Sequence, residues 1–133
     1  MSSQRATRWL SLDQIETLLG YSPRWWRDRL PEFAQVLRVG NGEPRVCEDA
    51  LAAWCDARRW ERTPDTQPLR VVGRYFSLAE LSLLLALSRR TLEREIRAGA
   101  FGPRSDVLLL GNELRVPAAG VAAFCAARRE VFA

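Results

Sequence analysis

Apolar residues recur at spacings of three and four residues in two separate stretches of the chain. The first set is Leu12, Ile15, Leu18 and Leu19, and the second set is Leu78, Leu81, Leu84 and Leu85. An α-helix turns once in about 3.6 residues, so each set falls on one face of a helix of about two turns. We expect both faces to point into a hydrophobic core.

A serine stands directly before each of these predicted helices. Ser11 is followed three residues later by Gln14, and Ser77 is followed by Glu80. In this arrangement the serine hydroxyl accepts a hydrogen bond from a first-turn N–H, and the Gln or Glu side chain accepts one from the serine N–H. The pattern predicts a capping box at the start of both helices.

A second serine in each stretch predicts a second helix after a short turn. The turns lie at residues 20–22 and 86–88, and the caps are Ser22 and Ser88. A three-residue turn between two short helices is the spacing of a helix-turn-helix. The pairs expected to point inward, at a spacing of four, are Trp26 with Leu30 and Leu92 with Ile96. The arginines between them are then left on an outward face.

Each stretch continues with a predicted β-hairpin and a closing helix. Residues 36–46 and 107–117 place β-favouring side chains on both sides of a Gly-Asn turn. The closing helices carry one apolar stripe each, formed by Leu51, Trp54 and Cys55 in the first and by Val121, Phe124 and Cys125 in the second. We expect Cys55 and Cys125, which occupy equivalent positions, to be small core thiols.

The elements therefore occur twice in the same order, as an internal repeat. The first block of the alignment sets Ser11 on Ser77. After a short insertion in the second copy, the match resumes with Arg45 on Arg115. Chance would rarely produce both blocks in one chain.

The repeat divides the chain into two modules. We place module 1 at residues 1–60, a linker with two prolines at 61–73, and module 2 at 74–133. The predicted fold class is mainly α with small β-hairpins (α+β).

Charge adds one specific feature to this picture. The net charge is only +4, from 20 basic and 16 acidic residues, and all basic residues are arginine because the chain lacks Lys and His. A guanidinium is a planar fork that grips a phosphate or a guanine edge at two points. A polyanion site must therefore come from the placement of arginines and not from bulk charge.

The same composition argues against catalysis. Without histidine the chain lacks the usual general base, and three cysteines without a C-x-x-C pair do not form a zinc site. We find no Gly-rich phosphate loop and no carboxylate pair in an apolar setting. We expect no enzyme activity, no catalytic residues, no metal and no cofactor.

No apolar run reaches the roughly 18 residues needed to cross a bilayer. The opening residues MSSQRATRW also lack the apolar stretch of a signal peptide. We expect a cytoplasmic protein with no membrane partner.

Residues 76–101, FSLAELSLLLALSRRTLEREIRAGAF, resemble the excisionase-like branch of the MerR superfamily. The ELRVP hairpin strand and the AAFCAARR helix extend this resemblance over most of residues 74–129. The first copy departs from the pattern, because Ser22-Pro-Arg-Trp-Trp replaces Ser-Arg-Arg-Thr-Leu and Pro31 ends the helix early. The resemblance implies two tandem winged helix-turn-helix modules, each with a second helix in the major groove and a hairpin at the neighbouring backbone.

Carried over by position, the resemblance implies DNA contacts in both modules. In module 2 the contact residues are Ser88, Arg89, Arg90, Thr91 and Arg94, with Arg115 on the hairpin. In module 1 they are Ser22, Arg24, Trp25 and Arg27, with Arg38, Asn41 and Arg45 on the hairpin.

Three of these interpretations have alternatives. The arginines at 89, 90 and 94 can form a solvated helix face, as charged residues usually do. Trp25 either packs on the partner module or contacts DNA, whereas Trp26 belongs to the core. The acidic residues Asp28, Glu93 and Glu95 must pair with arginine or point outward if the second helices approach phosphate.

The sequence predicts a sequence-specific binder of double-stranded DNA that reads two adjacent half-sites. Such a protein is a transcription regulator or an excisionase-like factor in DNA recombination, associated with the nucleoid. The alternative is a protein-interaction adaptor or a phage or mobile-element assembly component. Leu108, Leu109 and Leu110 make the second hairpin apolar, and they are the expected surface for a homodimer or protein partner.

Overall fold

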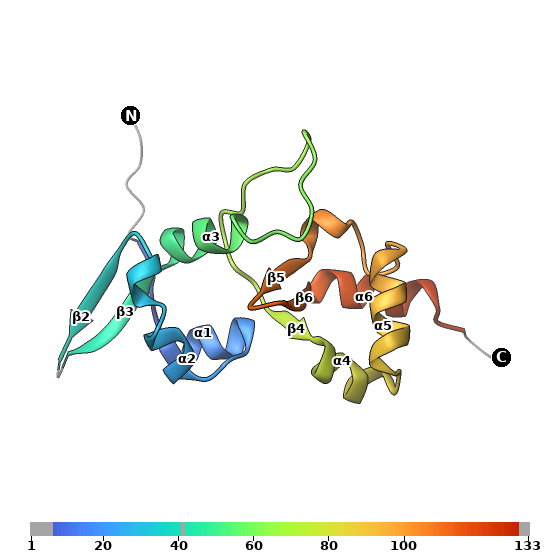
Figure 1. The fold of residues 1–133 in the computed structure, drawn as a ribbon, viewed down its shortest axis with the longest axis horizontal. Coiled ribbons are helices and arrows are strands. Elements are labelled where there is room, and N and C mark those ends of the chain that lie inside the picture. Colours follow the sequence, from blue (N-terminus) through green and yellow to red (C-terminus); the bar gives the residue numbers. More distant parts are fainter. Residues whose placement is uncertain (1–6, 41, 131–133) are drawn as a thin grey trace. The chain divides into compact units, whose positions relative to one another are not determined.

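The structure is a computed structural model that describes residues 7–40 and 42–130. Within these residues the chain forms six α-helices and two small three-stranded antiparallel sheets, with strand orders β1-β3-β2 and β4-β6-β5 (Figure 1). The expected class, helices with small hairpins, is confirmed at the level of a mixed α/β chain.

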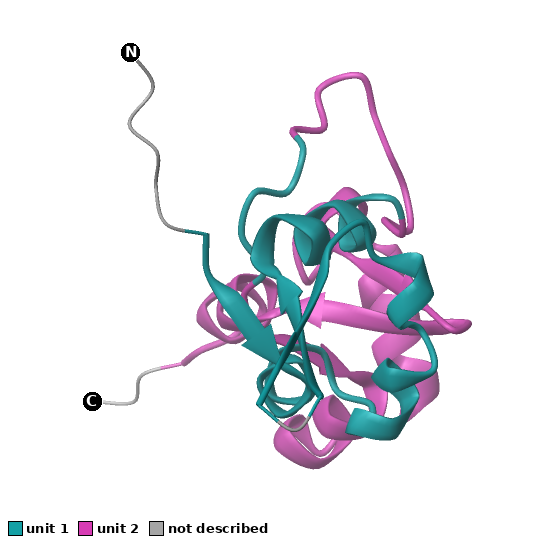
Figure 2. Ribbon diagram, turned by 90° about the vertical axis from the view of Figure 1, so that its left-hand side faces the viewer, with its two compact units in different colours: residues 1–57, 68–72 teal, residues 58–67, 73–133 magenta. Residues whose placement is uncertain are grey.

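The chain divides into two compact units (Figure 2). Unit 1 comprises residues 1–57 and 68–72, and unit 2 comprises residues 58–67 and 73–133. The elements of unit 1 are β1 (Trp9–Ser11), α1 (Leu12–Leu19), α2 (Pro23–Arg27), a 3-10 turn (Leu30–Glu32), β2 (Val36–Val39), β3 (Glu43–Cys47) and α3 (Glu48–Asp56).

Unit 2 repeats this order of elements. They are β4 (Tyr75–Ser77), α4 (Leu78–Leu85), α5 (Arg89–Arg97), a 3-10 turn (Arg104–Asp106), β5 (Leu108–Leu110), β6 (Glu113–Pro117) and α6 (Ala118–Ala127). In unit 1 the strand before the helix pair, β1, pairs with the hairpin strand β3, and in unit 2 β4 pairs with β6 in the same way. The chain segments before and after each helix pair therefore belong to one sheet.

Serine caps start the first two helices of each unit, as predicted. The Ser11 hydroxyl accepts from the Gln14 N–H at 3.1 Å, and the Gln14 side chain accepts from the Ser11 N–H at 2.8 Å. Ser77 and Glu80 form the same two bonds, each 3.1 Å long. Because these bonds use N–H groups that lack a partner inside the helix, they define where each helix begins.

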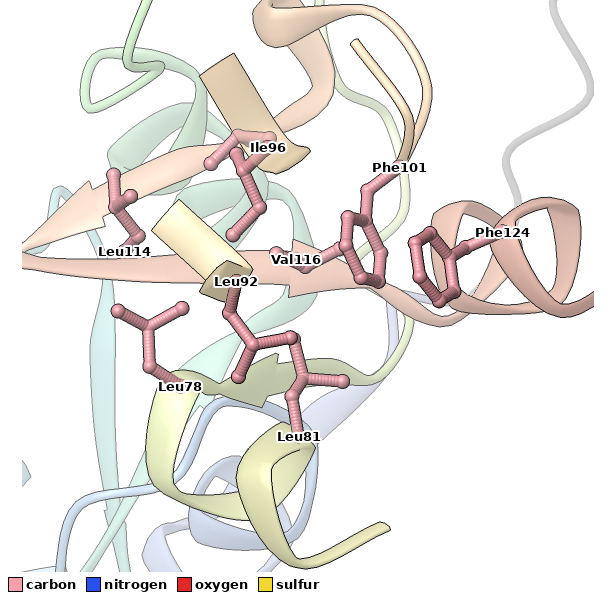
Figure 3. Packing of buried hydrophobic residues seen from close by; sticks show 9 residues of the cluster. Leu78, Leu81, Leu92, Ile96, Phe101, Leu114, Val116 and Phe124 are labelled. Carbon is pink, nitrogen blue, oxygen red and sulfur yellow. The ribbon is translucent and has the colours of Figure 1, made fainter. Parts of the chain in front are cut away.

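The core of unit 2 is built from the inward faces of α4, α5 and α6 against β6 (Figure 3). The buried side chains are Leu78, Leu81, Leu92, Ile96, Phe101, Val107, Leu114, Val116 and Phe124. The rings of Phe101 and Phe124 stack with their centroids 4.1 Å apart. This stack joins α6 to the loop after α5.

Gly120 permits this approach of α6. A Cβ atom at this position would lie 2.2 Å from the Phe101 carbonyl oxygen, so only glycine lets the helix reach that backbone. The equivalent residue in unit 1 is Ala50, because the alignment that sets Arg45 on Arg115 also sets Ala50 on Gly120. The two cores therefore differ at the contact of the closing helix.

The core of unit 1 is aromatic. Trp26 and Trp54 meet edge to face with centroids 5.2 Å apart, and Phe33 lies 5.5 Å from Trp54. The indole N–H of Trp26 donates to the Gly20 carbonyl at 2.9 Å, so the fully buried ring has its polar atom satisfied. The prediction that Trp26 belongs to the core is confirmed.

Two predictions of core residues are wrong. Leu84 is 61% exposed, and its neighbour Leu83 is 87% exposed. Leu78, Leu81 and Leu85 mark the inward stripe of α4, and Leu84 lies roughly a quarter of a turn away from the centre of that stripe. Leu84 fits the spacing of three and four residues, but it lies beside the buried face and not on it.

The second error concerns the equivalent cysteines. Cys55 is buried as predicted, but Cys125 is exposed. On α6 the core contacts are made by Gly120 and Phe124, at a spacing of four. Cys125, the next residue along, is turned about 100° away from Phe124 and meets solvent.

The segment between the repeats is bonded to the units. Leu109 and Trp60 donate backbone hydrogen bonds of 2.8 Å to the carbonyls of Arg58 and Val107, so residues 58–60 lie along β5. The Arg59 guanidinium, almost fully buried, donates to the carbonyls of Ser105 and Gln67 at 2.7 and 2.6 Å. Residues 58–67, which include half of the expected linker, thus belong to unit 2.

Gly120→Ala is expected to destabilise the protein by about 1–3 kcal/mol, because the new methyl group overlaps a backbone oxygen that cannot move away cheaply. Alanine is otherwise favoured over glycine in helices by about 1 kcal/mol. Thermal and urea unfolding measure the change, with Ala122→Gly on the exposed face of α6 as the control for helix propensity. A rise in stability for Gly120→Ala would contradict the close approach.

Glu80, which belongs to the capping box of α4, makes the stability of the fold depend on pH. Partial burial raises the pKa of its carboxyl, but hydrogen bonds from Ser77 and the ion pair with Arg74 outweigh burial and hold the pKa below the ordinary value of 4.5. Because the pKa is lower in the folded state, the ionised carboxylate stabilises the fold at pH values above the ordinary pKa of 4.5. This contribution is lost as the pH falls through the folded-state pKa.

Glu80→Gln should therefore lower stability at pH 7, by less than about 1 kcal/mol because the ion pair is exposed. Gln14 shows that glutamine preserves the capping box, so the variant removes only the charge. Urea unfolding of both proteins from pH 7 to pH 3 should show the difference shrinking with the fall in pH. A constant difference would show that the charge is not responsible.

Candidate nucleic-acid interface

Helix α5 separates an apolar face from an arginine face. Leu92 and Ile96 are buried, and Arg89, Arg90 and Arg94 are exposed. The Arg90 side chain forms no hydrogen bond or ion pair with any other residue that the structure describes. Arg90 and Arg94 therefore lie on the outward side of a helix that the core holds in place, whereas Arg89, three residues before Leu92, is exposed at the start of the helix.

The other two arginines form weak ion pairs. Arg89 Nε lies 3.6 Å from Glu93 Oε1, and Arg94 lies 4.0 Å from Glu95 Oε1. The arginine side chains are 64% and 72% exposed, and exposed pairs of this kind contribute little because water screens them. Both arginines remain open to a stronger anion. Of the two expected arrangements, pairing with arginine or pointing outward, Glu93 and Glu95 adopt the pairing.

Ser88 and Thr91 form the start of α5. The Ser88 hydroxyl accepts from the Thr91 N–H at 3.1 Å and donates to the Thr91 hydroxyl at 2.9 Å. Both side chains are thus engaged in the cap. The first N–H groups of a helix, here those of Arg89 and Arg90, have no acceptor within the helix, and the positive end of the helix dipole favours an anion.

The second helix of unit 1 is shorter and carries fewer basic residues. Ser22 caps α2 by accepting from the Trp25 N–H at 3.3 Å, and Arg24 and Arg27 are exposed. Neither arginine forms an ion pair within the described part of the chain. Asp28 ends the helix and is itself exposed, so it points outward as expected.

Trp25 packs inside its own unit. The Tyr21 ring stacks on the indole at 3.9 Å with an interplanar angle of 6°, and the Arg29 guanidinium carbon lies 3.4 Å from the indole centroid. Two groups this close to one ring centre must occupy opposite faces. Arg29 also donates to the Trp25 carbonyl at 3.1 Å, which holds the arginine over the ring.

Sequence reasoning missed Tyr21 and Arg29. They stand four residues before and four residues after Trp25, the spacing at which helical side chains meet, and this was the signal available. Tyr21 precedes the helix with a backbone φ of +65°, an unusual conformation for a residue other than glycine. The turn before α2 therefore adopts a conformation that periodicity does not reveal.

The hairpin of unit 1 exposes one of its predicted contact residues. Arg38 is exposed and donates to the Gly42 carbonyl at 3.1 Å across the turn. Arg45 is half-buried and donates to the Pro44 carbonyl at 3.0 Å. Asn41, the third predicted contact residue, lies outside the described residues.

The hairpin of unit 2 is different. Arg115 is only 3% exposed and donates to Glu113 Oε2 at 3.2 Å and to the Leu114 carbonyl at 3.3 Å. Leu108 and Leu110 are fully buried, and of the three hairpin leucines only Leu109 is exposed. Of the three leucines predicted as an apolar surface, only Leu109 is therefore available to a partner outside the chain, and Arg115 does not reach solvent.

Exposed apolar residues occur on α4 instead. Leu83 and Leu84 are the most exposed leucines among the described residues. Thr17 and Leu18 hold the equivalent positions of α1, and the outward position is polar there. The apolar outward face is thus a property of unit 2 and not a requirement of the fold.

The described residues contain neither a membrane-spanning helix nor a cluster of metal-binding side chains. None of their helices is long and apolar enough to cross a membrane. No group of three or more Cys, Asp or Glu side chains among them is arranged to hold a metal ion.

No family model matches the chain, and comparisons with curated proteins and with solved structures found no match.

Proposed function

We propose that the protein binds double-stranded DNA sequence-specifically through two winged helix-turn-helix modules, as a transcription regulator or an excisionase-like architectural factor. The observation that carries the proposal is that α5, a helix fixed by buried residues, exposes Arg90 and Arg94 on its outward face and Arg89 at its first position. The order strand, helix, helix, hairpin, helix in both units supports it.

The proposed chemistry is that of the guanidinium group. An arginine bidentate to guanine O6 and N7 reads a base in the major groove, and one that contacts phosphate positions the helix. The Arg90 guanidinium has no hydrogen-bond or ion-pair partner among the described residues and suits the first role. Arg89 stands at the helix N-terminus, where main-chain N–H groups assist in holding phosphate.

Binding of this kind needs no cofactor and no catalytic group. Its place of action is the cytoplasm, in association with the nucleoid. The modest net charge of +4 implies that affinity depends on these few placed arginines, and hence on ionic strength.

Arg90→Ala should weaken binding to the preferred duplex by about 1–3 kcal/mol, roughly 5- to 150-fold, because a base-reading contact is lost. Fluorescence anisotropy with a duplex obtained by binding-site selection measures this change. Arg70→Ala is the matched control, since Arg70 is exposed and lies outside every helix and strand. Equal affinities of Arg90→Ala and the parent protein would remove Arg90 from the interface.

Salt dependence tests the proposal independently of any one residue. Each neutralised phosphate adds about 0.9 to the slope of log K against log salt concentration. Three phosphate contacts, from the exposed Arg89, Arg24 and Arg27, predict a slope of about 2.7 in magnitude for the parent protein. A slope near zero would contradict DNA binding through arginine.

The second candidate function is that of a protein-interaction adaptor, or of an assembly component of a phage or mobile element. The exposure of Leu83 and Leu84 favours it, because adjacent exposed leucines on a short helix form an apolar contact surface. Anisotropy with a random-sequence duplex at low salt separates the two functions. A specific DNA-binding protein retains non-specific affinity there, and an adaptor does not.

A further inference from the structure

The two units differ at the positions that would face DNA. The alignment that sets Ser22 on Ser88 places α2 on α5, and it sets Arg24 on Arg90. This is the one outward arginine of α5 that both helices retain.

Two other exposed arginine positions of α5 are altered in α2. Arg94 corresponds to Asp28, an exposed carboxylate that repels the phosphate backbone. Arg89 corresponds to Pro23, which has neither a side-chain donor nor a backbone N–H. Arg27 takes the place of Glu93 and leaves α2 with two exposed arginines.

Helix length increases the difference. Helix α5 has nine residues and α2 has five, so at about 1.5 Å per residue they extend for roughly 13 Å and 7 Å. The outward side chains of α5 can therefore extend along a longer stretch of a groove than those of α2.

Trp25 does not restore base reading to α2. It stands where α5 has Thr91, but Tyr21 and Arg29 cover both faces of its indole. A ring covered on both faces cannot stack on a base or enter a base step. Arg29 is withdrawn from the outward face by its contacts with the same residue.

On the hairpins it is unit 1, and not unit 2, that exposes an arginine. Arg38 on the hairpin of unit 1 is exposed, whereas Arg115 on the hairpin of unit 2 is buried and paired with Glu113. Unit 1 thus presents isolated positive charges on both its helix and its hairpin. Single arginines of this kind suit phosphate contacts, which carry no sequence information.

We infer that only unit 2 reads base sequence, through Arg90 and Arg94 on α5, whereas unit 1 binds the DNA backbone through Arg24, Arg27 and Arg38. This inference rests on the proposed DNA-binding function. It predicts a target with one sequence-specific half-site, flanked by DNA of any sequence, in place of the two half-sites that an internal repeat suggests.

The test compares two double variants of the full chain, Arg90→Ala with Arg94→Ala and Arg24→Ala with Arg27→Ala. Each removes two exposed arginines from the second helix of one unit, so the loss of charge is matched. Circular dichroism and thermal melting show that both variants stay folded. Selection from a random duplex pool supplies the preferred duplex for the parent protein, and a scrambled duplex of equal length is the reference.

Discrimination is the ratio of the affinities for the preferred and scrambled duplexes. The unit 2 variant should lose about tenfold or more of this ratio, because base contacts are removed. The unit 1 variant should bind both duplexes more weakly by the same factor, with an unchanged ratio and a salt slope lower by about 1.8. Selection should return one block of specified bases.

Two results would overturn the inference and leave the proposed function standing. One is a loss of discrimination in the unit 1 variant equal to that in the unit 2 variant. The other is a selected site with two blocks of specified bases. If the parent protein binds no duplex at low salt, or selects no sequence, the proposed function and the inference fail together.

Discussion

The burial of Leu92 and Ile96 determines what α5 offers to a partner. These two residues lie one turn apart on the helix and are almost completely inaccessible to solvent. Since the backbone has no freedom to rotate about its axis while both remain buried, Arg90 and Arg94 must project outward. The Ser88 cap then sets the position at which the outward face begins. The interface proposed for unit 2 is therefore a consequence of core packing on the opposite side of the helix.

Unit 1 meets the same constraint with different side chains. Trp26 takes the place of Leu92 and fills the core with a much larger ring, whose N–H is satisfied by the Gly20 carbonyl. The chain then leaves the helix after Arg27 and reaches Leu30 in a 3-10 turn, where Pro31 follows. Leu30 is still buried, so the spacing of four between inward residues survives although the helix does not.

Local interactions were predictable from the sequence because each depends on a few neighbouring residues, as the serine caps and the inward position of Trp26 do. The burial of Arg115 and the exposure of Cys125 depend on which distant segment packs there, and spacing carries no information on this. The stack of Tyr21 on Trp25 was predictable only in part. The two residues are four positions apart, but the stack also needs a left-handed backbone at Tyr21, which tyrosine does not favour. A pattern identifies which side chains can meet, and only the free energy of the competing arrangements decides which of them do. The DNA-binding role stays a prediction for the same reason.

Under the proposed function, the ion pairs on α5 bear on how sequence specificity would arise. Glu93 and Glu95 stand beside the arginines and would approach the phosphates of any duplex that α5 enters. Their repulsion acts on every sequence alike, whereas a bidentate contact from Arg90 or Arg94 is gained only at a matching base. Acidic residues in this position lower the affinity for all DNA and leave the difference between sequences intact. With a net charge of only +4, the chain can therefore favour discrimination over tight non-specific binding.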